Sequence, residues 1–175
     1  LGPLWSSVFS PTQPKARAIP YLWKKEMILK KLEKAKRLLS VGTGSIDRRA
    51  VYLINPGMKH HQPHGWGGAT QTLYAAVQAI NPGEIAPSHR HKTSALRFIM
   101  EGTGATGSVN GVKYKFEPGD YLITPDWTWH DHANEGEDTV LWMDCLDIPF
   151  LQALTSSFFE PHPQEQQPLD FPNDY

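Results

Sequence analysis

Two blocks of the sequence, Gly83-Glu-Ile-Ala-Pro-Ser-His89-Arg-His91 and Gly119-Asp-Tyr-Leu-Ile-Thr-Pro125-Asp-Trp-Thr-Trp-His130-Asp-His132-Ala-Asn134, decide the fold and contain a candidate metal site. His89 and His91 are one residue apart, and on an extended strand such side chains project to the same side. His130 follows a Gly-Asp turn and a predicted strand, as expected for a ligand from an adjacent strand of an antiparallel barrel. Three imidazoles favour iron, zinc or copper, whereas magnesium and calcium prefer carboxylates. We therefore predict one metal ion held by His89, His91 and His130.

Around these blocks the sequence is typical of a mainly β domain. Short β-favouring segments alternate with glycine and proline, and Asn110-Gly111 predicts a two-residue hairpin turn. Many short antiparallel strands favour a sandwich or barrel. The predicted strands are residues 50–54, 73–80, 95–101, 104–109, 112–116, 121–124 and 139–144.

The two ends of the chain have a different character. Residues 1–23 contain four prolines and predict an extended arm. Residues 24–40 predict a helix with an apolar stripe of Ile28, Leu32, Ala35 and Leu39. Residues 150–159 predict a short helix, and the Pro-rich remainder predicts a linker or tail. We expect an arm and helix over 1–48, a metal-binding domain over 49–149, and a short helix with a linker or tail over 150–175.

Composition excludes several classes of function. A length of 175 residues suits one domain, and a net charge of -1 gives no basic footprint for nucleic acid. The single cysteine, Cys145, excludes an intramolecular disulfide framework and predicts a buried structural residue. No apolar run reaches the length of a membrane span. The chain is thus expected to be cytoplasmic, with no membrane or nucleic-acid partner.

Two other motifs are predicted to be unrelated to the site. Gly102-Thr-Gly104-Ala-Thr-Gly107 matches the dinucleotide-binding string, but β-like sequence follows it where that string requires a helix. We therefore expect tight turns between strands. His60, His61 and His64 cluster in a Gly/Pro-rich segment and are left out of the metal site.

Strand alternation suggests the residues around the metal. Tyr74 and Gln78 share one face of their strand, and Arg97 has the parity of the paired histidines if the strand is unbroken between them. An arginine inside a barrel requires an anion, for which an aromatic carboxylate is suitable. His132 is expected to face the same way as His130, with Asp144 orienting it through a hydrogen bond.

The two blocks resemble the two motifs of the cupin superfamily. The first motif normally continues from His-x-His to a glutamate, which falls here at Ala95 or Leu96, before a closing glycine, here Gly102. In the second, Trp127 stands where a glycine usually follows the proline. The resemblance implies a double-stranded β-helix, a jelly-roll-like barrel, with a three-histidine site.

Longer stretches resemble the gentisate 1,2-dioxygenases and the related salicylate and 1-hydroxy-2-naphthoate dioxygenases. These are residues 89–102 and 124–132, with Pro3-Leu4-Trp5, Pro20-Tyr-Leu-Trp23, Asn55-Pro-Gly57 and Leu146-Asp-Ile-Pro149. The resembled enzymes usually contain two cupins, of which the first carries the iron. This chain resembles that first half.

The resemblance implies an extradiol-type ring-cleaving dioxygenase that opens gentisate with dioxygen to maleylpyruvate. Fe(II) would be held by the three histidines, and the implied partners are a small aromatic carboxylate, dioxygen and further copies of the chain in a homo-oligomer, a tetramer in the resembled family. His132 and Asp144 would be catalytic. The implied substrate-binding residues are Arg97, Gln78, Tyr74 and one of Arg48 and Arg49.

Other functions remain open at this point. A related salicylate or 1-hydroxy-2-naphthoate dioxygenase, a non-catalytic metal-binding cupin and an inactive isolated half all fit the three histidines. A metal-dependent isomerase or an oxalate-type manganese oxidase is disfavoured, because those cupins generally use the glutamate that is absent here.

Overall fold

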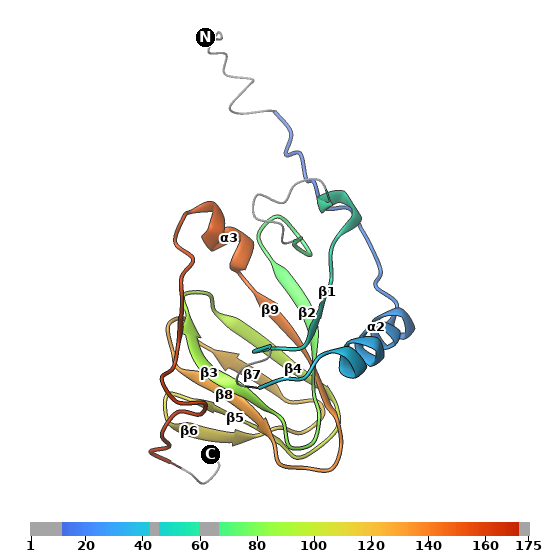
Figure 1. Cartoon of the computed structure of the whole chain (residues 1–175). Helices are drawn as coiled ribbons and strands as arrows, with labels where there is room; N and C mark the ends of the chain where they lie inside the picture. The colour runs from blue at the N-terminus through green and yellow to red at the C-terminus, as the bar shows by residue number, and fades with distance from the viewer. Residues whose placement is uncertain (1–11, 43–45, 60–66, 172–175) are drawn as a thin grey trace.

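The computed structural model describes residues 12–42, 46–59 and 67–171, and its main feature is a pair of five-stranded antiparallel sheets (Figure 1). The first sheet has the order β1-β2-β9-β4-β7 and the second β10-β3-β8-β5-β6. The strands of the first sheet are β1 (Ala50–Tyr52), β2 (Tyr74–Ile80), β9 (Val140–Leu146), β4 (Ala95–Glu101) and β7 (Tyr121–Thr124). Those of the second are β10 (Phe159–Pro161), β3 (Ile85–His91), β8 (His130–Asn134), β5 (Ala105–Val109) and β6 (Val112–Lys115). The prediction of a mainly β, jelly-roll-like barrel is confirmed.

The facing sides of the two sheets change character along their length. At one end, side chains from both sheets form an apolar core that includes Ile80, Ile99, Trp142, Ala86 and Ala105. Toward the other end, the same strands of the first sheet carry polar residues at alternate positions, which are also buried. These positions are Tyr74 and Gln78 on β2, Arg97 on β4 and Asp144 on β9. The apolar end fixes the barrel, and the polar end forms a pocket.

A helix covers the outer face of the first sheet. Helix α2 (Lys25–Leu38) lies against the first sheet (Figure 1) and buries Leu32 against Val77, Ala79 and Leu141. Val77 and Ala79 alternate with Gln78 along β2, so they lie on the side of the sheet opposite the pocket. The predicted stripe is confirmed at Ile28 and Leu32, whereas Leu39 lies beyond the helix and is exposed. Before the helix, the described part of the arm is fixed by Asn55, which exchanges hydrogen bonds with the backbone of Ile19 at 3.1 and 2.8 Å.

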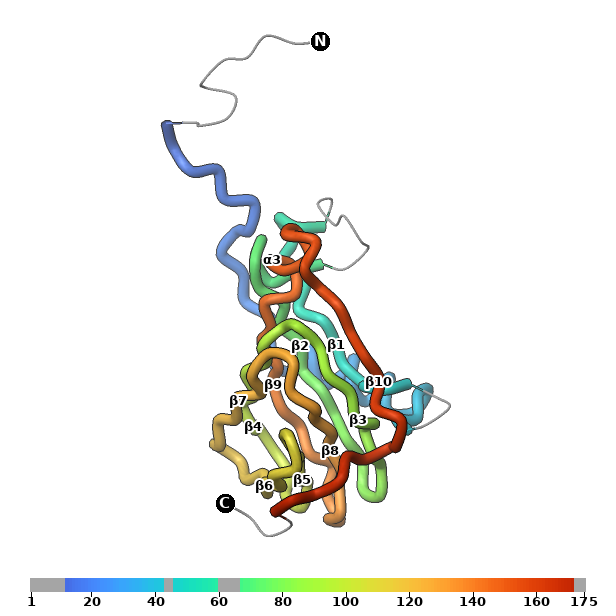
Figure 2. Tube along the Cα trace, turned by 90° about the vertical axis from the view of Figure 1, so that its left-hand side faces the viewer, coloured from blue at the N-terminus to red at the C-terminus, as the bar shows by residue number. Residues whose placement is uncertain are grey.

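The segment after β9 differs from the sequence prediction. Helix α3 (Ile148–Ala153) begins and ends earlier than predicted, and the following residues form β10, which pairs antiparallel with β3. Figure 2 shows residues 159–171 running beside β3 and on across the second sheet. We call residues 159–171 the strap. Because pairing with β3 creates β10, local propensity in this Pro-rich segment could not predict it.

The strap is anchored by a buried polar residue. Gln167 is 6% exposed, and its side chain donates to Ser108 Oγ at 2.9 Å and accepts from the Gly111 amide at 2.9 Å. Its own backbone amide donates to Asp131 Oδ2 at 3.0 Å. Farther along, Phe171 forms a bridge with Val112 of β6. The strap thus extends from β3 at one edge of the second sheet to β6 at the other.

The remaining sequence features have simple outcomes. Asn110 and Gly111 both have positive φ and close the β5-β6 hairpin as predicted. The glycine string at 102–107 joins β4 to β5 without a helix, as expected for tight turns. His60, His61 and His64 lie outside the described residues. None of the helices in the described part of the chain has the length and apolar composition that a membrane crossing requires.

Candidate metal centre

Three histidines meet on the inner face of the second sheet. His89 and His91 come from β3 and His130 from the neighbouring β8, and the ligand atoms that they offer all lie within 4.8 Å of one another. The ring centroids are 4.6 Å apart for His89 and His130, and 4.7 Å for His91 and His130. This arrangement has the size of a mononuclear metal site with three protein ligands and open positions for substrate.

A β-bulge aims the ligands inward. On β3, Ala86 pairs with His132 of β8 and His89 pairs with His130, so β3 has one more residue than β8 over this interval. The extra residue reverses the alternation, because Ala86 and His89 are an odd number of positions apart and yet both face the interior. Sequence alternation predicted that His89 and His91 share a face, but it could not predict this bulge.

The surroundings of the three histidine rings favour their neutral form, which is the form that binds a metal. His91 Nδ1 lies 2.7 Å from both the hydroxyl and the carbonyl oxygen of Thr93, and His130 Nδ1 lies 3.0 Å from the carbonyl oxygen of Thr128. These contacts leave the opposite nitrogens for a metal, and His130 Nε2 is buried without a hydrogen-bond partner. Burial lowers the pKa of His89, His91 and His130 below the usual value, which keeps the rings unprotonated at neutral pH.

The first sheet supplies the opposite wall of a cavity of about 400 Å³. Besides His89 and His91, five residues predicted from the sequence line this cavity: Tyr74, Gln78, Arg97, Asp144 and Arg48. Arg97 reaches the cavity by a route that the sequence did not suggest. The strand breaks between His91 and Ala95, and β4 belongs to the other sheet, so Arg97 faces the histidines across the barrel.

Arg97 and Asp144 form a buried cross-strand pair. Their side chains are 5% and 7% exposed, and Arg97 Nε lies 2.9 Å from Asp144 Oδ1. The two atoms are within ion-pair distance, but neither has a partner in hydrogen-bond alignment. Arg97 Nη1 donates instead to Thr124 Oγ1, and Asp144 Oδ2 accepts from Trp142 Nε1 at 3.0 Å. Burial raises the pKa of Asp144, and the charge of Arg97 opposes that rise.

Arg48 adds a second cation to the pocket. Its Nη1 donates to the carbonyl oxygen of Asp47 at 2.8 Å, while Nη2 is buried and has no hydrogen-bond partner in the part of the chain that the structure describes. Burial and the neighbouring charge of Arg97 lower the pKa of Arg48 to about 10, so it remains protonated at neutral pH. The other carboxylate residue of the lining, Asp47, is exposed, so the buried charges are two guanidinium groups and the carboxylate of Asp144, and this excess of positive charge favours an anionic ligand.

The structure places Arg49 away from the pocket. Its side chain is 1% exposed and donates to the carbonyl oxygen of Leu39 at 2.7 Å and to Glu84 Oε2 at 2.9 Å. Adjacent residues of a strand point to opposite faces, so only one of the two arginines could line the cavity. Arg49 connects the end of α2 to the turn between β2 and β3.

His132 is brought near the site, but the predicted hydrogen bond with Asp144 is not formed. Its ring is 1% exposed, and neither of its nitrogens has a hydrogen-bond partner within the described residues 12–42, 46–59 and 67–171. The indole of Trp142 lies against the ring, with centroids 5.3 Å apart, and donates to Asp144. Trp142 therefore contacts both residues. Burial, followed by the charges of Arg97 and Arg48, lowers the pKa of His132 well below its usual value.

Sequence analysis missed a third wall of the cavity. Residues that follow β9 line it beside the histidines, and the ring of Phe159 packs on His89 with centroids 4.8 Å apart. The missed lining residues are Ile148, Gln152, Ser157, Phe158 and Phe159. The only sequence signal was the pair of adjacent aromatic residues, Phe158 and Phe159, in a segment otherwise read as a helix end.

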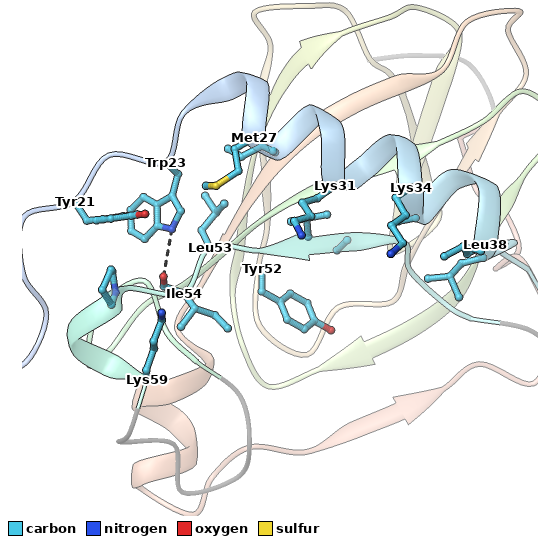
Figure 3. A pocket seen from close by; sticks show the side chains of 16 residues that line it. Tyr21, Trp23, Met27, Lys31, Lys34, Leu38, Tyr52, Leu53, Ile54 and Lys59 are labelled. Atoms are coloured by element: carbon cyan, nitrogen blue, oxygen red, sulfur yellow. Dashed lines mark hydrogen bonds between the residues drawn. The ribbon is translucent and has the colours of Figure 1, made fainter.

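A larger groove of about 600 Å³ lies elsewhere, between α2, β1 and the 3-10 helix η1 (Pro56–Met58) (Figure 3). Its lining is mostly apolar with three lysines, Lys31, Lys34 and Lys59, and among the described residues it contains no histidine, cysteine or carboxylate. Figure 3 shows Trp23 donating to the carbonyl oxygen of Ile54 at one end of the groove. Size alone therefore does not identify the reactive site, and the smaller pocket carries the polar chemistry.

Comparison with known proteins agrees with this geometry. The Cupin domain family matches residues 76–148. Gentisate 1,2-dioxygenase 1 of Aquipseudomonas alcaligenes is 40% identical over 175 residues, which cover 99% of this chain and 48% of that protein. A 1-hydroxy-2-naphthoate 1,2-dioxygenase of Nocardioides sp. is 37% identical over 88% of this chain and 38% of its own length.

Solved structures give the same picture. Salicylate 1,2-dioxygenase from Pseudoaminobacter salicylatoxidans, crystallised as an adduct with gentisate, superposes with a TM-score of 0.84 at 36% identity, covering 96% of this chain and 44% of that one. The chain spans about half the length of the curated relatives that it matches. It is therefore a cupin that is related by sequence, over nearly its whole length, to the gentisate 1,2-dioxygenase family.

Proposed function

We propose that this chain provides the iron centre of a dioxygenase that opens the ring of gentisate between the carboxyl-bearing and hydroxyl-bearing carbons, giving maleylpyruvate. The observation that carries the proposal is a cluster of three histidines, two of which, His89 and His91, line a cavity that also contains Arg97 and Arg48. Relatives with this activity match nearly the whole chain. We call the proposed cleavage extradiol-type because one of the two ring carbons that it separates bears a hydroxyl.

The donor set fits Fe(II). Imidazole is a suitable ligand for iron, and a buried unpartnered nitrogen such as His130 Nε2 is costly unless a metal or a donor satisfies it. His89, His91 and His130 would hold the ion, and the iron when bound would supply electron transfer between the aromatic acid and dioxygen. Because all three ligands are neutral, the substrate's own negative charge is not repelled by protein carboxylates at the metal.

The pocket suits a small aromatic acid. A volume of about 400 Å³ is within the usual range for small-molecule sites. We assign the substrate carboxylate to Arg97 and Arg48, because Arg48 Nη2 is buried and without a hydrogen-bond acceptor. Gln78 and the phenol of Tyr74 face the same cavity and would contact substrate hydroxyls. Burial raises the pKa of Tyr74, so the phenol remains a hydrogen-bond donor at neutral pH.

His132 and Asp144 are proposed to act in catalysis. His132 is kept neutral by its buried position, so it can accept a proton or donate one from its single N–H, but it cannot place a permanent positive charge in the site. Asp144 restrains Arg97 through their ion pair and is itself held by Trp142. Together these contacts fix the guanidinium before substrate arrives, which reduces the cost of ordering it on binding.

The decisive experiment compares substrates on one preparation of Fe(II)-loaded protein. Steady-state assays would follow the ring-fission chromophore with gentisate, salicylate and 1-hydroxy-2-naphthoate. We expect gentisate to give the highest kcat/KM, because its second hydroxyl enriches the ring in electrons. Faster turnover of salicylate or 1-hydroxy-2-naphthoate would reassign the substrate. Full iron occupancy without turnover of any of the three would indicate a non-catalytic cupin or an inactive half.

A further inference from the structure

Three segments of the chain meet at the side chain of Arg90. Its guanidinium carbon lies 4.3 Å from the ring centroid of Trp127 and 4.5 Å from that of Trp129. Its Nη2 lies 2.7 Å from Glu160 Oε2, and its Nε donates to the same oxygen at 2.8 Å. Arg90 therefore joins β3, the loop that precedes β8, and β10 of the strap.

Together, the contacts of these segments reach all three histidines of the proposed metal site. The backbone amide of Trp127 donates to the carbonyl oxygen of His91 at 2.8 Å. Trp129 directly precedes His130. Phe159, the neighbour of Glu160 in β10, packs its ring on His89. Because His89 Nδ1 is buried and has no hydrogen-bond partner among the described residues, ring packing is the restraint that the structure shows for this ligand.

The backbone at Trp127 points to the same conclusion. Trp127 has a φ of 57°, in the left-handed region that an indole-bearing residue rarely adopts. The resembled cupin motif has glycine here, which adopts that conformation without steric cost. A tryptophan retained in a strained conformation needs a compensating contact, and the face of its ring is on Arg90.

We propose that Arg90 is a positioning residue for the metal centre. It holds the two segments that carry the ligands, and the strap that restrains His89, in one arrangement through two cation-π contacts and a two-nitrogen contact with Glu160. A planar guanidinium can do all of this at once, whereas a lysine ammonium cannot stack on two rings. The inference rests on the proposed three-histidine site and concerns metal affinity, not the chemical step.

The test measures metal affinity with Co(II) as the probe, by competition with a chelator, together with the thermal unfolding of the metal-free protein. Arg90→Met retains the apolar stem but removes the charge and the planar group. We expect it to raise the Kd for Co(II) about 10- to 100-fold, as for other residues that orient metal ligands. The visible absorption of bound Co(II) is expected to change as well. Arg90→Lys is expected to recover part of the affinity.

Lys113→Met is the matched control. Lys113 forms an ion pair with Glu135 at 2.8 Å, with a lysine exposure of 23% that resembles the 26% of Arg90, but Glu135 contacts none of the three histidines in the structure. We expect this variant to bind Co(II) as the unsubstituted chain does.

Trp127→Gly is a second test variant, because it relieves the backbone strain and removes one stacked ring. We expect it to bind Co(II) more weakly although the strain is relieved.

The outcomes separate the two proposals. Binding of Co(II) by Arg90→Met within twofold of the unsubstituted chain would overturn the inference, as would an equal loss in Lys113→Met. If Arg90→Met does not fold, Trp127→Gly and Glu160→Gln provide the test. Unchanged Co(II) affinity in both of these variants would also overturn the inference about Arg90. If the unsubstituted chain binds neither Co(II) nor Fe(II), the metal site itself is wrong. Tight binding that the Arg90 variants leave unchanged removes only the role of Arg90.

Discussion

Two guanidinium groups share the pocket with a single buried carboxylate, and this imbalance gives the candidate site its preference for an anion. Sequence alternation predicted Tyr74 and Gln78 on one face of β2, and the structure puts both in the cavity. Sequence alternation could not decide which of Arg48 and Arg49 faces the cavity. Alternation assigns residues to faces only when the face of at least one residue in the strand is already known. The register of β1 with β2 provides that assignment.

The first prediction at this scale concerns the metal ligands. His91→Ala removes one of three imidazoles, so iron occupancy after anaerobic purification should fall severely. His64→Ala, in the histidine cluster that sequence analysis left out of the site, is the control and should retain full occupancy. Metal analysis of both proteins decides the point. Full iron content in His91→Ala would contradict the three-histidine assignment.

The second prediction concerns Arg97. Arg97→Met should lower kcat/KM by a factor that corresponds to about 3–4 kcal/mol of lost transition-state stabilisation, because it deletes the proposed partner of the substrate carboxylate. It also leaves Asp144 buried without its ion-pair partner, so the protein should lose stability as well. The double variant Arg97→Met/Asp144→Asn removes both charges, and it should regain stability without regaining activity. Activity that recovers together with stability would mean that Arg97 only supports the fold.

The third prediction separates the two adjacent arginines. Arg49→Met should reduce the free energy of unfolding by about 3–5 kcal/mol, because Glu84 loses its buried partner. It should leave the KM for substrate unchanged in whatever fraction is folded. Arg48→Met should have the opposite profile, with a raised KM and little loss of stability. Chemical denaturation and steady-state kinetics on both variants check this, and reversed profiles would exchange their roles.

At the scale of the element, the pairing of Arg49 with Glu84 links helix α2 to the β2-β3 turn. Burial alone would raise the pKa of Glu84, but hydrogen bonds and charge from Arg49, with the Asn81 amide, lower it below the usual 4.5. A carboxyl with a lowered folded pKa contributes stability above its unfolded pKa and loses that contribution as the pH falls through the folded value.

The fourth prediction follows from the stability that Glu84 is expected to lose as the pH falls. Between about pH 5 and pH 3 the unsubstituted protein should lose stability partly through protonation of Glu84. Glu84→Gln should start less stable at pH 7 and decline less over the same interval. Urea unfolding of both proteins at several pH values measures the difference. Parallel curves would show that Glu84 does not contribute to acid sensitivity.

The elements themselves were predictable to different degrees. Residues 95–101 and 121–124 form strands with the predicted bounds, because alternating apolar residues and flanking glycines act locally. The β3 bulge and strand β10 were not predictable, because each exists only through pairing with a distant partner. The same limit applies to Phe159, whose place in the cavity depends on β10.

At the scale of the whole molecule, the proposed division into an arm and helix, a cupin and a tail remains a prediction, as do the homo-oligomer and the cytoplasmic location. Helix α2 packs on the first sheet and the strap on the second, so we propose that both are integral to the cupin unit. Light scattering on the purified chain tests the predicted oligomer, and a monomer that retains iron and activity would contradict the expected tetramer.

Strap pairing also has a consequence for solubility. Without β10, strand β3 would become the edge of its sheet and present unpaired backbone groups to other molecules. Such an edge is a template for intermolecular strand addition and so for aggregation. A chain that ends after α3 should therefore precipitate or form fibrils on concentration, although it retains every histidine of the metal site, and turbidity with thioflavin binding would detect this. The strap is thus expected to protect the protein against self-association as well as to line the pocket.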